Sequence, residues 1–197
     1  MPKSRFYCII CLVLLLVPAA AGMVYGFDDG FGSARRVEGK YFTVYYASQV
    51  DPAELSQKLN IGVEDRVLTG GSTEKWGSDY AGGSADSLAD MVDTLFLRVS
   101  DILDMHIYSF HGNIKVCRNE AQLSNLYKEF FGREPENHTL FVADLNTIYT
   151  SPDNFTKEVL GHEIAHAIMS RYFVVQPPIK VAEVLAGYVE YQLRKKK

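Results

Sequence analysis

Two histidines and one glutamate interrupt an apolar run, LGHEIAHAIMSRYF, at residues 160–173. His162 and His166 are four residues apart, so on a helix they face the same way, one turn above the other. Imidazoles placed in this way can offer two nitrogens to a single Zn²⁺, which favours nitrogen and sulfur ligands. The spacing therefore predicts a helix that binds zinc through both histidines.

The glutamate between the histidines, Glu163, follows His162 directly and lies about 100° further around a helix. Its carboxylate can flank the metal without ligating it, and can accept a proton from a zinc-activated water as a general base. Apolar residues at 160, 164, 167 and 168 predict that this helix is buried, where each unpaired polar group costs about 1–3 kcal/mol. One metal ion would satisfy all three side chains; two ordinary histidines without a metal are the alternative.

A catalytic zinc usually has three protein ligands and one open position. Glu183 is the candidate third ligand, because the 16 residues between it and His166 allow one helix to end, turn at Pro177-Pro178 and return as a second helix. Its apolar neighbours favour this role over that of an ordinary helix acid, since an unpaired carboxylate would be costly among them. Glu190, on the same face of the second helix, is either an alternative ligand or a residue that orients a histidine ring.

The HEIAH motif, followed by Glu183 in the setting AEVLAGY, resembles the gluzincin clan of zinc metallopeptidases, in particular the small bacterial peptidase MA-like proteins. The resemblance covers residues 162–188 and implies His162, His166 and Glu183 as zinc ligands. It implies hydrolysis of peptide bonds with Glu163 as the general base. It also implies a zincin-like core with a small sheet whose edge strand, NTIYTS at 146–151, runs beside the active helix and could pair with a peptide substrate.

Two departures from the family pattern bear on activity. Val184 stands where a small residue usually follows the ligand glutamate, and the sequence continues for only 31 residues after His166. Larger members carry a further C-terminal subdomain that supplies an oxyanion-stabilising Tyr or His, for which Tyr149, Tyr188 and His111 are the candidates here. One lost oxyanion donor costs about 10²–10³ in turnover. Two functions that use zinc therefore stay open, beside a membrane-anchored scaffold without metal, which the long apolar N-terminus leaves possible. The first is a zinc metallopeptidase whose activity could be weak or lost, and the second is a non-catalytic, zinc-stabilised binding module of the cell envelope.

The first 26 residues have the order of an export signal: MPKSR, a long apolar stretch, and the small residues Ala19–Ala21 before a cleavage site. The absence of charge from Phe6 to Phe27 leaves an uncleaved membrane anchor as the alternative. Both interpretations place the domain outside the cytoplasm, so the protein is expected to be periplasmic or secreted, or anchored with its domain outside. Residues 27–38 are predicted to be a tether, and residues 39–197 the metallopeptidase-like domain.

The composition fits one folded domain, since 47% of the 197 residues are hydrophobic. The net charge of −4 argues against nucleic acid as a partner. The expected partner is a peptide or protein substrate, with membrane contact only through the N-terminal segment if it is not cleaved. Cys117 is the only cysteine after residue 26, so it is predicted to be a small buried hydrophobe rather than half of a disulfide.

Hydrophobic periodicity and turn residues predict the elements that must position the three polar side chains. Strands are expected at 41–46 and 113–118, with two more within 139–151. Helices are expected from 51, at 88–103, at 120–132, through HEIAH, and from about 180 to the C-terminus. This order predicts an α+β fold, a small mixed sheet packed with helices, in which the HEIAH helix is followed by a C-terminal ligand helix.

Overall fold

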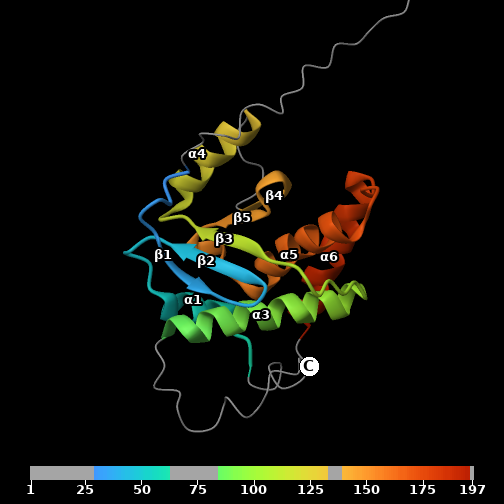
Figure 1. Cartoon of the computed structure of the whole chain (residues 1–197), viewed down its shortest axis with the longest axis horizontal. Helices are drawn as coiled ribbons and strands as arrows, with labels where there is room; N and C mark the ends of the chain where they lie inside the picture. The colour runs from blue at the N-terminus through green and yellow to red at the C-terminus, as the bar shows by residue number, and fades with distance from the viewer. Residues whose placement is uncertain (1–28, 63–83, 133–138, 196–197) are drawn as a thin grey trace, which may run out of the picture.

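The computed structural model describes residues 29–62, 84–132 and 139–195, which fold as a mixed α+β domain (Figure 1). The predicted signal or anchor at 1–26 lies outside these ranges. The strands are β1 (Arg35–Glu38), β2 (Phe42–Tyr46), β3 (Gly112–Val116), β4 (Thr139–Val142) and β5 (Thr147–Thr150). The helices are α1 (Pro52–Leu59), α3 (Ser84–Leu103), α4 (Glu120–Phe131), α5 (Lys157–Tyr172) and α6 (Ile179–Arg194). The α+β class and the order of elements from β2 onward agree with the prediction.

The five strands form one mixed sheet in the order β1-β2-β3-β5-β4. β2, β3 and β5 run parallel, and the edge strands β1 and β4 are each antiparallel to their neighbours. β5 is buried along its whole length, as expected of a strand covered on both faces. The expectation that residues 146–151 form the edge strand is therefore wrong. β5 pairs with β3 on one side and with β4 on the other, and β4 is the edge strand.

Helices cover both faces of this sheet (Figure 1). Because side chains alternate along a strand, Ile148 and Tyr149 of β5 point to opposite faces. Ile148 belongs to the large core that α1, α3, α5 and α6 build, whereas Tyr149 packs in a smaller core with α4. Cys117 is fully buried in the smaller core and unpaired, as predicted. Among the described residues, no helix is both long and apolar enough to cross a membrane.

The segment that was predicted to be a tether is part of the folded domain from residue 29 onward. Arg35–Glu38 forms β1, paired with β2, and Phe31 is buried in the smaller core. The carboxylate of Asp29 accepts a 2.8 Å hydrogen bond from the hydroxyl of Tyr149 and pairs with the ammonium of Lys115. The polar RRVE sequence gives no alternating pattern that would distinguish such a short edge strand from a linker.

The two C-terminal helices pack closely on each other. α5 begins at a Thr156 cap and is buried on the face predicted from its apolar stripe, with Leu160, Ile164, Ala167 and Ile168 fully buried. α6 covers α5 with Ala186, Val189 and Leu193, all fully buried. The approach is closest at Gly161, where a Cβ atom would lie 2.2 Å from Cδ1 of Leu193. A larger residue therefore fits at this position only if the Leu193 side chain or one of the helices moves.

Candidate metal centre

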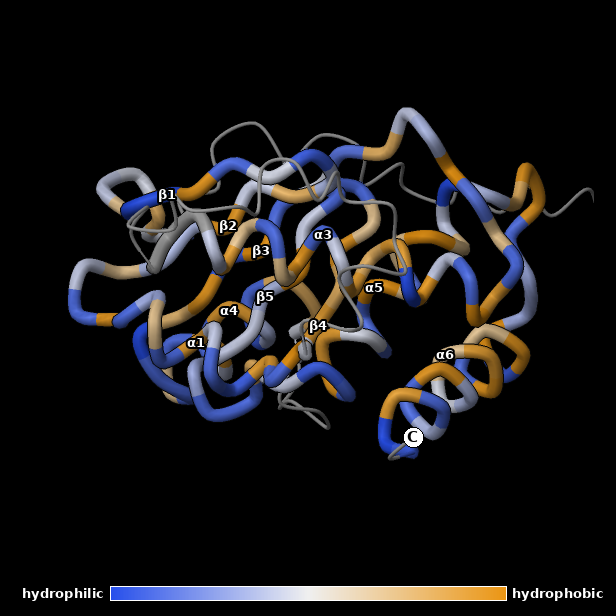
Figure 2. The backbone as a smooth tube through the Cα atoms, turned by 90° about the horizontal axis from the view of Figure 1, so that it is seen from below, coloured by the Kyte–Doolittle hydropathy of each residue, from blue (hydrophilic) through white to orange (hydrophobic). Residues whose placement is uncertain are grey.

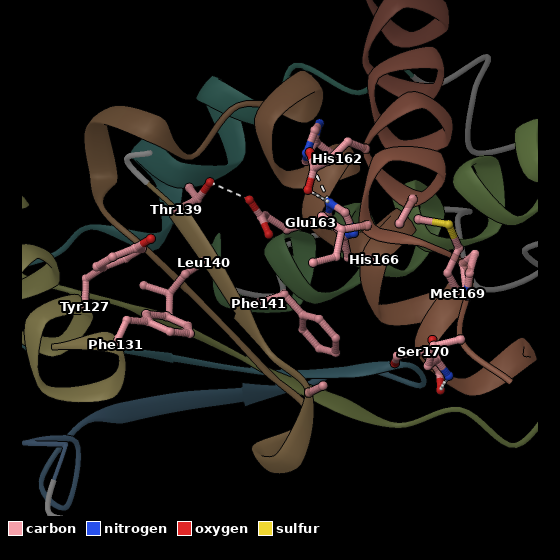
Figure 3. A pocket seen from close by; sticks show the side chains of 16 residues that line it. Tyr127, Phe131, Thr139, Leu140, Phe141, His162, Glu163, His166, Met169 and Ser170 are labelled. Carbon is pink, nitrogen blue, oxygen red and sulfur yellow. Dashed lines mark hydrogen bonds and ion pairs between the residues drawn. The ribbon is translucent and has the colours of Figure 1, made fainter. Parts of the chain in front are cut away.

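α5 presents both histidines on the face that looks toward α6 (Figure 3). The side chains of His162 and His166 are half-buried, and their Nε2 atoms lie 3.2 Å apart. The helix is fixed by its buried stripe on the opposite side, so the two rings are held by a rigid element. Two imidazole nitrogens thus point at one position in space, as the spacing predicted.

α6 brings a carboxylate to the same position. The Oε2 atom of Glu183 lies 3.5 Å from Nε2 of His162, and its Oε1 atom lies 3.5 Å from Nε2 of His166. Ligand atoms bound tetrahedrally to one zinc at ~2.1 Å lie ~3.4 Å from one another. The two 3.5 Å separations end on different oxygens of Glu183. With one ligand atom from each residue, the three atoms lie within 4.8 Å of one another, close enough to share one metal ion after small side-chain adjustments. In the described part of the chain, these three residues are also the set of metal-ligating side chains close enough to share one ion.

The setting of Glu183 differs from what the sequence suggested. Its neighbours Val181 and Val184 are exposed, and about half of the Glu183 side chain is exposed as well. The expectation that burial among apolar residues would demand a metal partner is therefore wrong. Glu183 reaches the histidines because the α6 face that carries it adjoins the face that packs on α5.

Glu190 lies on the far side of the His162 ring rather than beside the shared position. Its Oε2 atom is 3.6 Å from Nδ1 of His162, and its other oxygen pairs with Arg194. The Nδ1 atom is buried and has no hydrogen-bond partner among the described residues. When Nε2 binds a metal, the ring proton resides on Nδ1, facing a carboxylate that can accept it. This location suits the ring-orienting role better than that of an alternative ligand.

Glu163 is buried and held by the edge strand β4. The hydroxyl of Thr139 donates a 2.7 Å hydrogen bond to its Oε1 atom, and the backbone N–H of Phe141 also donates to the carboxylate. Burial raises the pKa of Glu163, against the opposing effects of these hydrogen bonds and of the nearby His162. A carboxylate with a raised pKa is suited to accepting and returning a proton.

The pKa of His166 is shifted in the opposite direction. Burial lowers it first, and the nearby positive charge of His162 lowers it further, while Glu183 opposes both effects. A lowered pKa keeps the imidazole neutral near physiological pH. The neutral ring is the form that binds a metal ion.

A cavity of about 670 Å³ opens over the histidines and Glu163 (Figure 3). One wall is built from α4 and β4, and the other from α5 and α6. Its apolar lining includes Tyr127, Phe131, Leu140, Phe141, Met169 and Ile179. Within the described residues β4 pairs with no strand other than β5, so its outer edge beside this cavity is not covered by another strand. A peptide in extended form could therefore lie along β4 with a side chain in the cavity.

The three candidates for oxyanion stabilisation do not line this cavity. Tyr149 points to the opposite face of the sheet, where it is bonded to Asp29, and Tyr188 lies on the exposed side of α6. His111 is bonded through its two ring nitrogens to the Thr43 hydroxyl and the Lys40 carbonyl. The structure therefore brings together both histidines, Glu163, Glu183 and Glu190, and leaves these three residues elsewhere.

Two residues that matter for the site were missed from the sequence. Thr139 gave no signal, because a threonine at the start of a strand is ordinary. Gly161 could have been noticed, since glycine inside a helix costs about 1 kcal/mol and so indicates a close approach. Comparisons of the chain with known protein families, with curated proteins and with solved structures found no match. The function must therefore follow from the site itself.

Proposed function

We propose that this protein is an exported zinc metallopeptidase of the gluzincin type, with a zincin-like domain. His162, His166 and Glu183 would hold the ion. The observation that carries this proposal is that one ligand atom from each of these residues lies within 4.8 Å of the other two, with the two histidine Nε2 atoms 3.2 Å apart. A buried carboxylate, that of Glu163, lies beside this set on the same helix.

In this proposal, each residue of the site has a distinct role in peptide hydrolysis. Zinc, when bound, would supply a Lewis acid that polarises the peptide carbonyl and acidifies water. Glu163 accepts the proton of the attacking water and returns it to the leaving amine. Thr139 and the Phe141 N–H hold the carboxylate in place, and Glu190 fixes the orientation of the His162 ring.

Substrate binding would use the outer edge of β4 and the adjoining cavity. An extended peptide adds to a free edge by backbone pairing, which is independent of side-chain sequence. The apolar lining of the cavity favours a peptide with an apolar side chain next to the scissile bond. The export part of the proposal depends on the signal-like sequence of residues 1–26.

A second candidate function is a zinc-stabilised binding module without catalysis. The observation in its favour is that Tyr149, Tyr188 and His111 all lie away from the cavity. Such a module would keep the three zinc ligands and the edge of β4, and would bind a partner without cutting it. Glu163 would then be dispensable.

The test is zinc content together with cleavage of a broad fluorogenic peptide library. We expect one zinc per chain in the wild type, and Glu163→Gln should retain the ion and lose cleavage. Glu158→Gln is the matched control, since Glu158 lies in the first turn of the same helix and outside the site. Zinc without cleavage in the wild type would favour the binding module, and absence of zinc would contradict both functions.

A further inference from the structure

The outward side of α6 carries a stripe of exposed apolar and tyrosine side chains. α6 turns Ala186, Val189 and Leu193 toward the domain, and Glu183 toward the histidines. Exposed residues recur on the opposite side at spacings of three, four and three. We call them the α6 stripe: Val181, Val184, Tyr188 and Tyr191. Val184 is the most exposed of them, at 71%.

Further exposed apolar residues lie in the connection between α5 and α6 and at the first residue of α6. Val174 is fully exposed, Val175 is 83% exposed and Ile179 is 79% exposed. Figure 2 shows this connection and α6 at one end of the molecule, with hydrophobic residues along both. Exposed apolar surface of this kind usually marks a binding face.

The charge around the α6 stripe is one-sided. From Arg171 to Lys197 the sequence has six cationic and two acidic side chains, a net charge of +4, whereas the whole chain carries −4. Both acids face inward: Glu183 lies against the histidines, and Glu190 lies against His162 and Arg194. Among the described residues of α6, Lys180 and Lys195 are exposed, while the two carboxylates are directed to the histidines and Arg194.

One cation lies directly on the α6 stripe. The ammonium of Lys195 sits 4.3 Å from the centre of the Tyr191 ring. Lys180 is exposed at the other end of the helix. Apolar and tyrosine side chains bordered by lysines are characteristic of helices that lie in the interface of an anionic membrane.

We propose that the α6 stripe docks this protein on the surface of an anionic lipid bilayer. Lys180 and Lys195 would meet lipid headgroups, while Val184 and Tyr191 would enter the interfacial region. A second copy of the chain fits less well, since it would bring two cationic faces together. The docking is peripheral, because α6 also carries Glu183 and Glu190 on its inner side.

Docking would place the candidate site next to the bilayer. Ile179 belongs to the exposed apolar surface and also lines the cavity. If the proposed peptidase function holds, membrane-associated polypeptides are the substrates that this cavity would meet. The docking itself does not depend on that function or on zinc.

The test places a fluorescent reporter on the α6 stripe of the full chain. Trp76, the only tryptophan, is changed to Phe, and Tyr191→Trp then gives a single reporter. Its emission is measured with vesicles of phosphatidylcholine and phosphatidylglycerol that contain brominated acyl chains. We expect a blue shift and quenching, both reduced in high salt because surface charges are then screened. Tyr108→Trp is the matched control, since Tyr108 is 89% exposed on the connection between α3 and β3.

Charge reversal sharpens the test. Each basic residue near an anionic surface changes the docking equilibrium about fivefold, so Lys180→Glu together with Lys195→Glu should abolish quenching at position 191. No quenching at 191, equal quenching at 108, or equal quenching with pure phosphatidylcholine would overturn the proposal. A blue shift that depends on protein concentration without vesicles would also overturn it, in favour of a dimer. Zinc content and cleavage are measured on the same samples, so failure of docking is distinguishable from failure of the peptidase.

Discussion

The two helices that form the candidate metal centre are equally long and differ in how they are held. α5 and α6 each have 16 residues. α5 is buried between the sheet, α3 and α6, whereas α6 packs through one face and leaves the other exposed. The proposed ligands on α5 are therefore fixed by the core, and the proposed ligand on α6 depends on the contact between the two helices. α5 alone positions the two histidines, and α6 adds the carboxylate of Glu183.

The largest expected effect is a loss of zinc affinity, which should differ between the proposed ligands on α5 and the one on α6. His166→Ala should lower zinc affinity by more than the ~10–100-fold that follows the loss of a residue that only orients a ligand. Glu183→Ala should cost less, because its carboxylate is half exposed and water can replace it. Competition with a chromogenic chelator measures both. Equal losses would show that the two helices contribute alike.

The contact between the helices can be disturbed without touching a ligand. Gly161→Ala places a methyl group 2.2 Å from Cδ1 of Leu193, and such overpacking typically costs about 1–3 kcal/mol. We expect a lower free energy of unfolding, because the buried Leu193 side chain or α6 itself must shift, and weaker zinc binding to the extent that α6 moves away from α5. Thermal melts with and without zinc measure the two effects.

The matched control for this change is Gly187→Ala on α6. Nothing lies within 4 Å of the Cβ atom that it adds. Replacing a helical glycine with alanine there should stabilise the chain by roughly 0.5–1 kcal/mol and leave zinc affinity unchanged. Weaker zinc binding in this variant would mean that the site is sensitive to any change in α6.

A smaller effect is expected from Glu190, which contacts the ring of a ligand and not the shared position. Glu190→Ala should lower zinc affinity about 10–100-fold, because Nδ1 of His162 then lacks an acceptor. Arg194→Ala is the control, since it removes the other partner of Glu190 and leaves the carboxylate in place. If Glu190→Ala abolished binding as fully as His166→Ala, Glu190 would have to be a ligand.

The smallest effect concerns the opposite face of the sheet. Burial, followed by the negative charges of Asp29 and Glu120, raises the pKa of Cys117 to about 12, from the ordinary value of about 8.5. The folded state therefore holds the thiol proton more tightly than the unfolded state. The resulting stability is complete below pH ~8.5 and is lost as pH rises toward 12. In denaturant melts across this range, the wild type should lose stability relative to Cys117→Val, whether or not zinc is present.

Much of the fold could be predicted from local sequence patterns. Helical spacing located α3, α4 and the HEIAH helix, and Pro177-Pro178 indicated where the chain turns before α6. The pattern could not place β4 outside β5, because strand order depends on pairing with β3, which is distant in sequence. β1 was missed because RRVE has a single apolar residue.

The candidate site was predictable to the same extent. The histidines and Glu163 share one helix, so a helical wheel fixes their relation. Glu183 was found from its distance along the chain, although the argument from burial was wrong. Thr139 could not be found, since its contact with Glu163 joins residues 24 positions apart that no local pattern connects.

All three proposed ligands come from one helical hairpin, at residues 157–194. An ion held there would cross-link two helices that are neighbours in sequence and so close a short loop. Such a cross-link restricts the unfolded chain less than one between residues far apart in sequence. Removal of the ion with a chelator should therefore release α6 from α5 and leave the sheet intact. Hydrogen exchange would then accelerate in α6 while β2, β3 and β5 keep their protection, a local opening and not a global collapse.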